Sequence, residues 1–302
     1  MFVRLLGAAA GGGLPQWNCR CPNCQEARKG RIPPLTQSGV AFSADGGRWY
    51  LVNASPDLRA QVEAFPKFHP EGTALRFNPI EAVLLTNADL DHALGLLLLR
   101  EGDALTIHAT HAVRETLVEG LRIEALLGAF CGLQWHEPPR DNFSPLPSKN
   151  GRASGLSYRA IALAQSPPLY FPRNAGDGAQ SVAYEIKDDR TGGKLLVAPD
   201  VGCLTPDLLA ALGEADAVLF DGTFWCDDEL KRVKGTSRTA LEMGHLPIQT
   251  HGLNVLRNLR ARYKIFLHIN NTNPILQPGS TERAEVEAAG VTIGQDGMEF
   301  TL

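Results

Sequence analysis

Two apolar runs enclose an acidic turn in the stretch Ala82-Val83-Leu84-Leu85-Thr86-Asn87-Ala88-Asp89-Leu90-Asp91-His92-Ala93-Leu94-Gly95. The first run has the length and composition of a buried strand, and the second run, from Ala93 onwards, has those of a helix. A turn between a strand and the following helix lies at the edge of a sheet, where the ligand sites of α/β proteins gather. The stretch therefore predicts an α/β fold with a polar site on this turn.

The same alternation of strand and helix patterns continues through the chain. Short apolar runs predict strands at 2–6, 39–42, 49–52, 82–85, 106–108, 195–198, 217–220 and 264–268. Helical patterns lie at 57–64, 93–100, 110–127, 205–215, 237–243 and 252–263. Segments 137–157 and 167–178 are rich in residues that favour irregular structure, and the first is predicted to be a long loop or lid. We expect a single domain over residues 1–302, built from two similar halves.

Composition and charge exclude several classes of function. The chain has 302 residues, of which 44% are hydrophobic and 21% charged, the balance of a globular protein. The net charge is −4 and the basic residues are scattered, so neither nucleic acid nor a membrane surface is an expected partner. No apolar run approaches the roughly 20 residues of a membrane span, and the first residues lack the pattern of a secretory signal. A cytoplasmic location is therefore expected.

The acidic turn is a candidate metal site. Asp91 and His92 offer one carboxylate oxygen and one imidazole nitrogen, a pair that suits Zn, Fe or Mn. Asp and Asn also cap helix N-termini, which is the alternative explanation of this turn. Capping explains one acid, whereas Asn87, Asp89 and Asp91 together with His92 exceed that need. We therefore predict that the turn takes part in metal binding.

A second polar segment follows an apolar strand in the run Leu267-His268-Ile269-Asn270-Asn271-Thr272-Asn273-Pro274. A single His is more often a structural residue than a ligand. The strand end places His268 in the same layer as the acidic turn, however, so we predict that it binds the same metal as Asp91 and His92. Weaker candidates are Asp200 and Asp221, each of which follows an apolar strand and equally fits an ordinary cap or turn, and His245, which lies in a further polar interruption.

Three cysteines crowd together as Cys19-x-Cys21-x-x-Cys24, whereas Cys131, Cys203 and Cys226 are isolated. Thiolates at this spacing can surround a tetrahedral zinc ion, and a closed sulfur-rich site of this kind is structural. The cluster therefore predicts a structural Zn(II) site. The sequence leaves its fourth ligand open, because Asn271, His245, His251 and His268 all remain candidates.

These residues together resemble the metallo-β-lactamase superfamily, and within it the proteins of pyrroloquinoline quinone (PQQ) biosynthesis. The resemblance covers essentially the whole chain and rests on the strings at 11–19, 53–59, 97–102, 191–195, 221–223, 242–246 and 268–276. It implies an αβ/βα sandwich, in which two mixed β-sheets are flanked by helices.

The chain departs from the metal motif of this superfamily, His-x-His-x-Asp-His. Asn87 and Asp89 stand where the two leading histidines are expected, while Asp91 and His92 keep their places. The histidine normally supplied from mid-chain is also missing, since no His occurs between His136 and His245. The resemblance therefore implies one metal centre instead of two.

Two imidazoles and one carboxylate are the ligand set of non-haem Fe(II) oxygenases. The resemblance accordingly implies that Asp91, His92 and His268 hold Fe(II), which with O₂ hydroxylates a tyrosine-derived PQQ precursor. Asn87, Asp89 and Asp221 would surround this centre, and His245 would position the phenol or relay a proton as a further catalytic residue. A homodimer is an assembly that the chain could form.

Two other functions stay open at this point. The first is a non-enzymatic carrier that binds PQQ or its precursor and has no need of a redox metal. The second is a metal-dependent hydrolase, because the cysteine cluster also resembles that of a cyclic phosphodiesterase with the same fold. The missing histidines weigh against the hydrolase, since they remove the second metal of a dinuclear centre.

Overall fold

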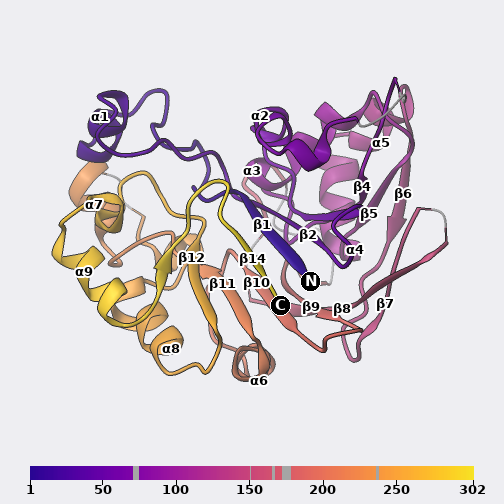
Figure 1. The fold of residues 1–302 in the computed structure, drawn as a ribbon. Helices are drawn as coiled ribbons and strands as arrows, with labels where there is room; N and C mark the ends of the chain where they lie inside the picture. Colours follow the sequence, from indigo (N-terminus) through magenta and orange to yellow (C-terminus); the bar gives the residue numbers. More distant parts are fainter. Residues whose placement is uncertain (71–74, 150, 165–166, 172–177, 236–237) are drawn as a thin grey trace.

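The computed structural model describes residues 1–70, 75–149, 151–164, 167–171, 178–235 and 238–302. In these residues the strands form two seven-stranded sheets. The sheets lie face to face in the centre, and helices cover both outer sides (Figure 1). The predicted αβ/βα sandwich is confirmed. The described residues contain no helix that is long and apolar enough to cross a membrane.

The first sheet has the strand order β14-β1-β2-β3-β4-β5-β6. Its strands are β1 (Phe2–Gly7), β2 (Gly39–Ser43), β3 (Trp49–Val52), β4 (Ile80–Leu84), β5 (Leu105–His108), β6 (Leu133–His136) and β14 (Glu299–Thr301). The strands from β14 to β3 pair antiparallel, whereas those from β3 to β6 pair parallel. The C-terminal strand β14 thus forms one edge of the sheet that is otherwise built from the N-terminal half of the chain.

The second sheet repeats this plan with the order β13-β12-β11-β10-β9-β8-β7. Its strands are β7 (Ser144–Pro147), β8 (Ala153–Leu163), β9 (Ser181–Asp188), β10 (Lys194–Ala198), β11 (Ala217–Asp221), β12 (Tyr263–Leu267) and β13 (Thr292–Ile293). Here too the strands change from antiparallel to parallel pairing, at β10. The chain therefore has two similar halves, as the sequence patterns predict.

The helices are mostly short. They are α1 (Pro22–Arg28), α2 (Leu58–Glu63), α3 (Leu90–Ala93), α4 (His111–Glu115), α5 (Ile123–Gly128), α6 (Pro206–Glu214), α7 (Glu229–Lys234), α8 (Leu253–Arg257) and α9 (Thr281–Ala288). Single 3-10 turns occur at Pro66–Phe68, Leu94–Leu99, Leu241–Met243 and Pro274–Leu276, and π-helical turns at Thr116–Gly120 and Ile248–Gly252.

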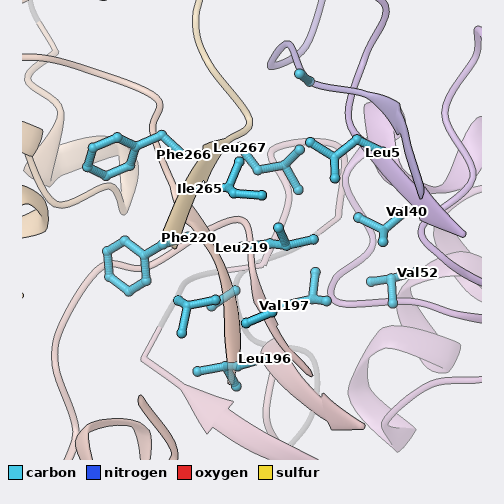
Figure 2. Close-up of a cluster of buried hydrophobic side chains, with 14 of the residues drawn as sticks. Leu5, Val40, Val52, Leu196, Val197, Leu219, Phe220, Ile265, Phe266 and Leu267 are labelled. Atoms are coloured by element: carbon cyan, nitrogen blue, oxygen red, sulfur yellow. The ribbon is translucent and has the colours of Figure 1, made fainter. Parts of the chain in front are cut away.

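The core lies between the two sheets and beneath the helices of each. In Figure 2, Leu5 and Val40 of the first sheet point toward Leu219 of the second, whereas Phe220 points the opposite way, toward the helices. Successive strand residues face opposite sides, so parallel strands such as β11 are buried on both faces, and residues 217–220 of that strand are all apolar. This explains why the sequence predicts them well.

Several segments differ from their predictions. The prediction of one long loop at 137–157 is wrong, because β7 and the start of β8 lie within it, and the alternation of buried Leu156 and Tyr158 outweighs the Ser and Pro content. The predicted helix at 93–100 is a 3-10 helix from Leu94, since the Gly95 N–H donates to the Ala54 carbonyl oxygen at 2.8 Å. The predicted helix at 110–127 breaks at Arg122, whose φ is +55°.

At the C-terminal side, the predicted helix at 252–263 ends at Arg257, because Tyr263 already belongs to β12. Of the predicted helix at 237–243, the described part is the 3-10 turn Leu241–Met243. The predicted irregular segment at 167–178 lies partly outside the described residues.

His108 at the end of β5 makes the stability of the fold depend on pH. Its ring is fully buried against Tyr158, whose hydroxyl lies 2.7 Å from Nδ1, and among the described residues Nε2 has no hydrogen-bond partner. Burial, helped by the neighbouring His136, lowers the pKa of His108 to about 3. The neutral ring is therefore favoured in the folded state. The contribution of His108 to the free energy of unfolding is fully present above the pKa of an unfolded histidine, about 6.5, and it falls as the pH drops below that value.

We expect the wild type to lose about 1.4 kcal/mol of unfolding free energy through His108 between pH 7.5 and 5.5. The His108→Gln variant should lack this part of the pH dependence, whatever its stability at pH 7.5. Urea unfolding of the metal-free proteins at both pH values measures the difference. His111→Gln, at an exposed position, is the control. An equal pH dependence in wild type and His108→Gln would contradict the assignment.

Candidate metal centre

The predicted metal ligands meet at the carboxyl ends of the parallel strands. Asp91 and His92 lie on α3, which follows β4, and His268 follows β12 directly. The ligand atoms of these three residues lie within 4.8 Å of one another. Residues 177 positions apart in the sequence thus form one cluster. The strand ends bring them together, as expected for an α/β fold.

The hydrogen bonds of His92 and His268 leave one ring nitrogen of each facing the cluster. His92 Nδ1 lies 2.8 Å from Asn87 Oδ1, which can only accept, so Nδ1 carries the hydrogen. His268 Nδ1 lies 2.9 Å from Thr223 Oγ1. Because a metal-binding His usually donates its other N–H to a polar partner, this arrangement presents both Nε2 atoms as ligands.

The charges of the cluster fit a cation. His268 Nε2 lies 3.2 Å from Asp91 Oδ2, a distance at which a proton or a metal ion must hold the two acceptors together. Burial lowers the pKa of His268, but the carboxylates of Asp200, Asp91 and Asp221 outweigh it and raise this pKa to about 10. Burial likewise raises the pKa of Asp91, yet His92 and His268 hold it well below its usual range. The residues present therefore fit a bound divalent metal.

His268 has a strained backbone. Its φ is +58°, in the left-handed region that is uncommon for any residue other than Gly. The Ile269 N–H donates to the Ala8 carbonyl and the Thr223 hydroxyl lies 3.0 Å from the His268 carbonyl, so both sides of the residue are held. Such strain persists where the surrounding structure fixes it, and it is common at functional sites.

Asp200, which the sequence left undecided, lies at the centre of the histidines. Its Oδ2 accepts a hydrogen bond from Asn87 Nδ2 at 3.1 Å and lies 3.5 Å from His92 Nδ1. Its Oδ1 lies 3.5 Å from His268 Nδ1 and 3.8 Å from His245 Nδ1. Asp200, His245 and His268 form a second group that could hold a metal ion, and it shares His268 with the first.

His245 and Asp221 form a buried pair beside this centre. His245 Nδ1 lies 2.8 Å from Asp221 Oδ2, and Asp221 also accepts from the Val201 N–H and the Thr223 hydroxyl. Burial lowers the pKa of His245, but the charge and hydrogen bond of Asp221 outweigh it and raise this pKa. The structure thus places Asp221 behind His245 and Thr223, outside the Asp91–His92–His268 cluster.

The centre opens into a cavity of about 590 Å³. Asp89, Asp91, His245 and His268 line it. Burial, followed by the charge of Asp200, raises the pKa of Asp89 to about 6. Gly11 also lines the cavity, and a Cβ at this position would stand 3.1 Å from Asp91 Oδ2. The segment that follows β1 therefore forms part of the wall, through Ala10 and Gly11.

The three clustered cysteines surround one side chain. Asn271 Nδ2 lies 3.2 Å from the Sγ atoms of Cys19 and Cys24 and 3.4 Å from that of Cys21. The Gln16 N–H also points at Cys24 Sγ, at 3.3 Å. All six cysteines of the chain are free, and these three form a group that could hold a metal ion.

Of the four candidates for the fourth ligand, the structure brings only Asn271 to the sulfur atoms. His245 and His268 belong to the other centre, and His251 is exposed and contacts Thr250. A half-turn of the Asn271 amide would place Oδ1, a metal ligand, where Nδ2 now lies. The turn 268–273 thus joins both clusters, since His268 and Asn271 are three residues apart.

Sequence reasoning missed Thr223. Its hydroxyl contacts Asp221, His245 and His268 and so orders two rings. The sequence held a signal for this residue, because Asp221-Gly222-Thr223 follows an apolar strand just as the metal-binding segments at Asp91 and His268 do. A threonine that acts through other side chains carries no ligand pattern of its own, and only the fold reveals its role.

The chain is similar in sequence and in fold to proteins of one superfamily. The model of the β-lactamase superfamily domain matches residues 48–269. The coenzyme PQQ synthesis protein B of Cupriavidus necator is 42% identical over 308 residues, which cover 99% of each chain. The crystal structure of Zn²⁺-bound PqqB from Methylobacterium extorquens matches with a TM-score of 0.89 and 38% identity, over 100% of both chains. A diphosphatase of the PhnP family shares the fold, with a TM-score of 0.67 and 16% identity over 99% of this chain and 96% of that one.

Proposed function

Since this chain belongs to the coenzyme PQQ synthesis protein B family of the β-lactamase superfamily, and so has a role in the synthesis of that cofactor, we propose that it hydroxylates a tyrosine-derived PQQ precursor with Fe(II) and O₂. The M. extorquens PqqB structure is a zinc-bound form of that protein. Zinc has no redox chemistry, so it can occupy such a site without supporting oxygenation.

The observation that carries this proposal is the cluster of Asp91, His92 and His268, of which Asp91 and His268 line the cavity. Two imidazoles and one carboxylate leave coordination positions open for O₂ and substrate. Fe(II) bound there would supply the activation of O₂ for transfer of one oxygen atom to the aromatic ring. Asn87 and Thr223 orient the two imidazoles, and Asp89 adds a further carboxylate to the cavity wall.

The chain's own residues also provide for proton transfer. His245 lines the cavity, and its Nδ1 faces the buried carboxylate of Asp221. Because Asp221 fixes the hydrogen on Nδ1, Nε2 of His245 is the atom that can accept or return a proton of the substrate phenol. We propose this role for His245, with Asp221 as its positioning residue.

The test is anaerobic loading of the purified protein with Fe(II), followed by ¹⁸O₂, ascorbate as the two-electron reductant and a tyrosine-derived precursor. We expect mass spectrometry to find one ¹⁸O atom in the product for each turnover. The zinc-loaded protein is the control and should give no product. Absence of oxygen incorporation, together with tight binding of PQQ, would contradict the hydroxylase and favour the carrier.

Replacement of Asp221 by Asn is expected to lower the pKa of His245, because the negative charge that raises it is removed. NMR titration of the diamagnetic zinc-loaded protein measures this pKa. The turnover rate of the iron-loaded variant should fall at least about hundredfold, the usual contribution of general acid–base catalysis. Asp228→Asn, on the surface, is the control. An unchanged His245 pKa would contradict the pairing.

A metal-dependent hydrolase is the second candidate, and the group of Asp200, His245 and His268 favours it. Both groups, however, share the single ring of His268, whose Nδ1 already faces Thr223. Two metal ions would therefore need both nitrogens of one imidazole. Metal analysis decides between the two candidate functions, since the hydroxylase needs one ion at this centre and the dinuclear hydrolase needs two.

We also propose that Cys19, Cys21 and Cys24 hold a structural Zn(II) ion, with Asn271 as the fourth ligand. The convergence of three sulfur atoms on one amide supports this arrangement. Burial raises the pKa of Cys19, but hydrogen bonds from Cys21, Cys24 and Asn271 outweigh it and lower this pKa. A lowered thiol pKa favours the thiolate that a zinc ion requires.

A further inference from the structure

The cavity at the metal centre is strongly acidic. Asp89, Asp91, Asp200 and Glu242 all line it. Among its described lining residues Arg238 is the only lysine or arginine. An anionic group that enters this cavity meets four carboxylates, and apart from the histidines of the metal centre Arg238 is the described lining side chain whose positive charge attracts it. The position of Arg238 therefore determines where such a group can bind.

Arg238 belongs to a short segment that is fixed to the centre. Its Nη2 donates to the Glu242 carbonyl at 2.9 Å, and the Glu242 carboxylate accepts from the Thr239 N–H at 2.7 Å. The His245 N–H donates to the Ala240 carbonyl at 3.0 Å. The same turn thus holds both Arg238 and His245 against the cavity, although Arg238 itself is exposed to solvent.

We propose that Arg238 recognises a carboxylate of the amino-acid precursor at the mouth of the cavity. This inference rests on the proposed function, since it names the residue that gives the site its substrate specificity. An amino acid derived from tyrosine carries an α-carboxylate, and a guanidinium matches a carboxylate with two parallel hydrogen bonds. The bond to the Glu242 carbonyl holds the guanidinium in place for this contact.

The recognition would also orient the substrate. An α-carboxylate bound at the mouth directs the aromatic ring inward, toward Asp91, His245 and His268 on the cavity wall. The reverse orientation would bring the carboxylate beside Asp89 and Asp200, the lining carboxylates outside the Asp91–His92–His268 ligand group, and their like charge disfavours it. Arg238 is therefore a positioning residue for the reaction and a determinant of specificity.

The test compares the precursor with its α-carboxyl methyl ester. Binding of each compound to the Fe(II)-loaded protein is measured anaerobically by calorimetry, for the wild type, Arg238→Gln and Arg238→Lys. We expect the wild type to bind the acid about tenfold to hundredfold more tightly than the ester, the range of a hydrogen bond to a charged group. Arg238→Gln should lose this preference, and Arg238→Lys should keep part of it, because Lys supplies the charge without the planar fork.

Arg232→Gln is the matched control, since Arg232 is exposed on α7 and pairs with Asp228 away from the cavity. It should keep the wild-type preference. If Arg238→Gln weakens the acid and the ester equally, Arg238 only supports the turn and the proposal is wrong. An unchanged preference in Arg238→Gln would overturn it as well. Turnover is measured separately, so failure of the wild type to hydroxylate would contradict the proposed function without altering this affinity ratio.

Discussion

Replacement of His268 by Ala is expected to abolish iron binding at the active centre and to leave the fold intact. The variant loses an Nε2 ligand, while Asp91 and His92 remain as an incomplete pair. Loss of an outer partner of a metal ligand already costs about 10–100-fold in metal affinity, so loss of the ligand itself should cost at least about hundredfold. Iron content after anaerobic loading and gel filtration measures the loss, and the hydroxylation assay should fall in parallel. His92→Ala should behave in the same way.

Two controls make this result specific. His251→Ala removes an exposed histidine outside both metal groups, and it should keep full iron content and activity. Circular dichroism should show the same fold for all these variants. If His268→Ala and His92→Ala both remain fully active, the Asp91–His92–His268 centre is wrong. If only one of them keeps full iron content and activity, the residue replaced in that variant is not a ligand of the ion.

Removal of the structural zinc site should destabilise the whole protein. Cys24 is completely buried and packs in the larger core cluster, so Cys24→Ala takes away both a ligand and the ion. We expect zinc content to fall by one ion per chain and the melting temperature to fall by about 10 °C or more, since each kcal/mol shifts it by about 2–4 °C in larger domains. Calorimetry and metal analysis provide the measurements.

This variant should also bind iron more weakly, although it touches no iron ligand. Asn271 and His268 lie on one turn, and the turn loses its sulfur contacts when the zinc site is lost. Cys131→Ala, at an isolated free cysteine, is the control and should change the content of neither metal.

Asn271→Asp keeps an oxygen ligand and should retain zinc, whereas Asn271→Ala should not. Full zinc content in Asn271→Ala would contradict the role of Asn271 as fourth ligand.

The sequence predicts the parallel strands well for a physical reason. Strands such as β11 are buried on both faces, so a run such as 217–220 is apolar throughout and can be recognised without knowledge of its neighbours. β8 is half-buried and polar on its exposed face, with Ser, Gly and Arg among its residues, and its pairing with β9 along eight residues decides its structure. Such tertiary pairing leaves only a weak local signal.

The residues of the candidate site also fall into those with a local sequence signal and those that only tertiary contacts reveal. Asp91, His92 and His268 are recognisable because each follows a buried strand and carries a metal ligand. Asp200 also follows a strand, but its place among three histidine rings depends on how the two halves of the sandwich meet. Thr223 and Arg238 act through contacts made only in the folded chain, so residue type and spacing alone could not single them out.

The left-handed backbone of His268 has a consequence for protein engineering. Glycine adopts this conformation without strain, so glycine at this position would relieve backbone energy, of order 1–3 kcal/mol, that the histidine stores. The same substitution would remove a cationic ring from beside the buried carboxylates of Asp91 and Asp200, which is the larger loss, so neither a library selected for thermostability nor one selected for turnover should enrich glycine at residue 268. Backbone preference and side-chain contacts are opposed at this one position, because the residue that completes the metal centre is not the residue that the chain path prefers.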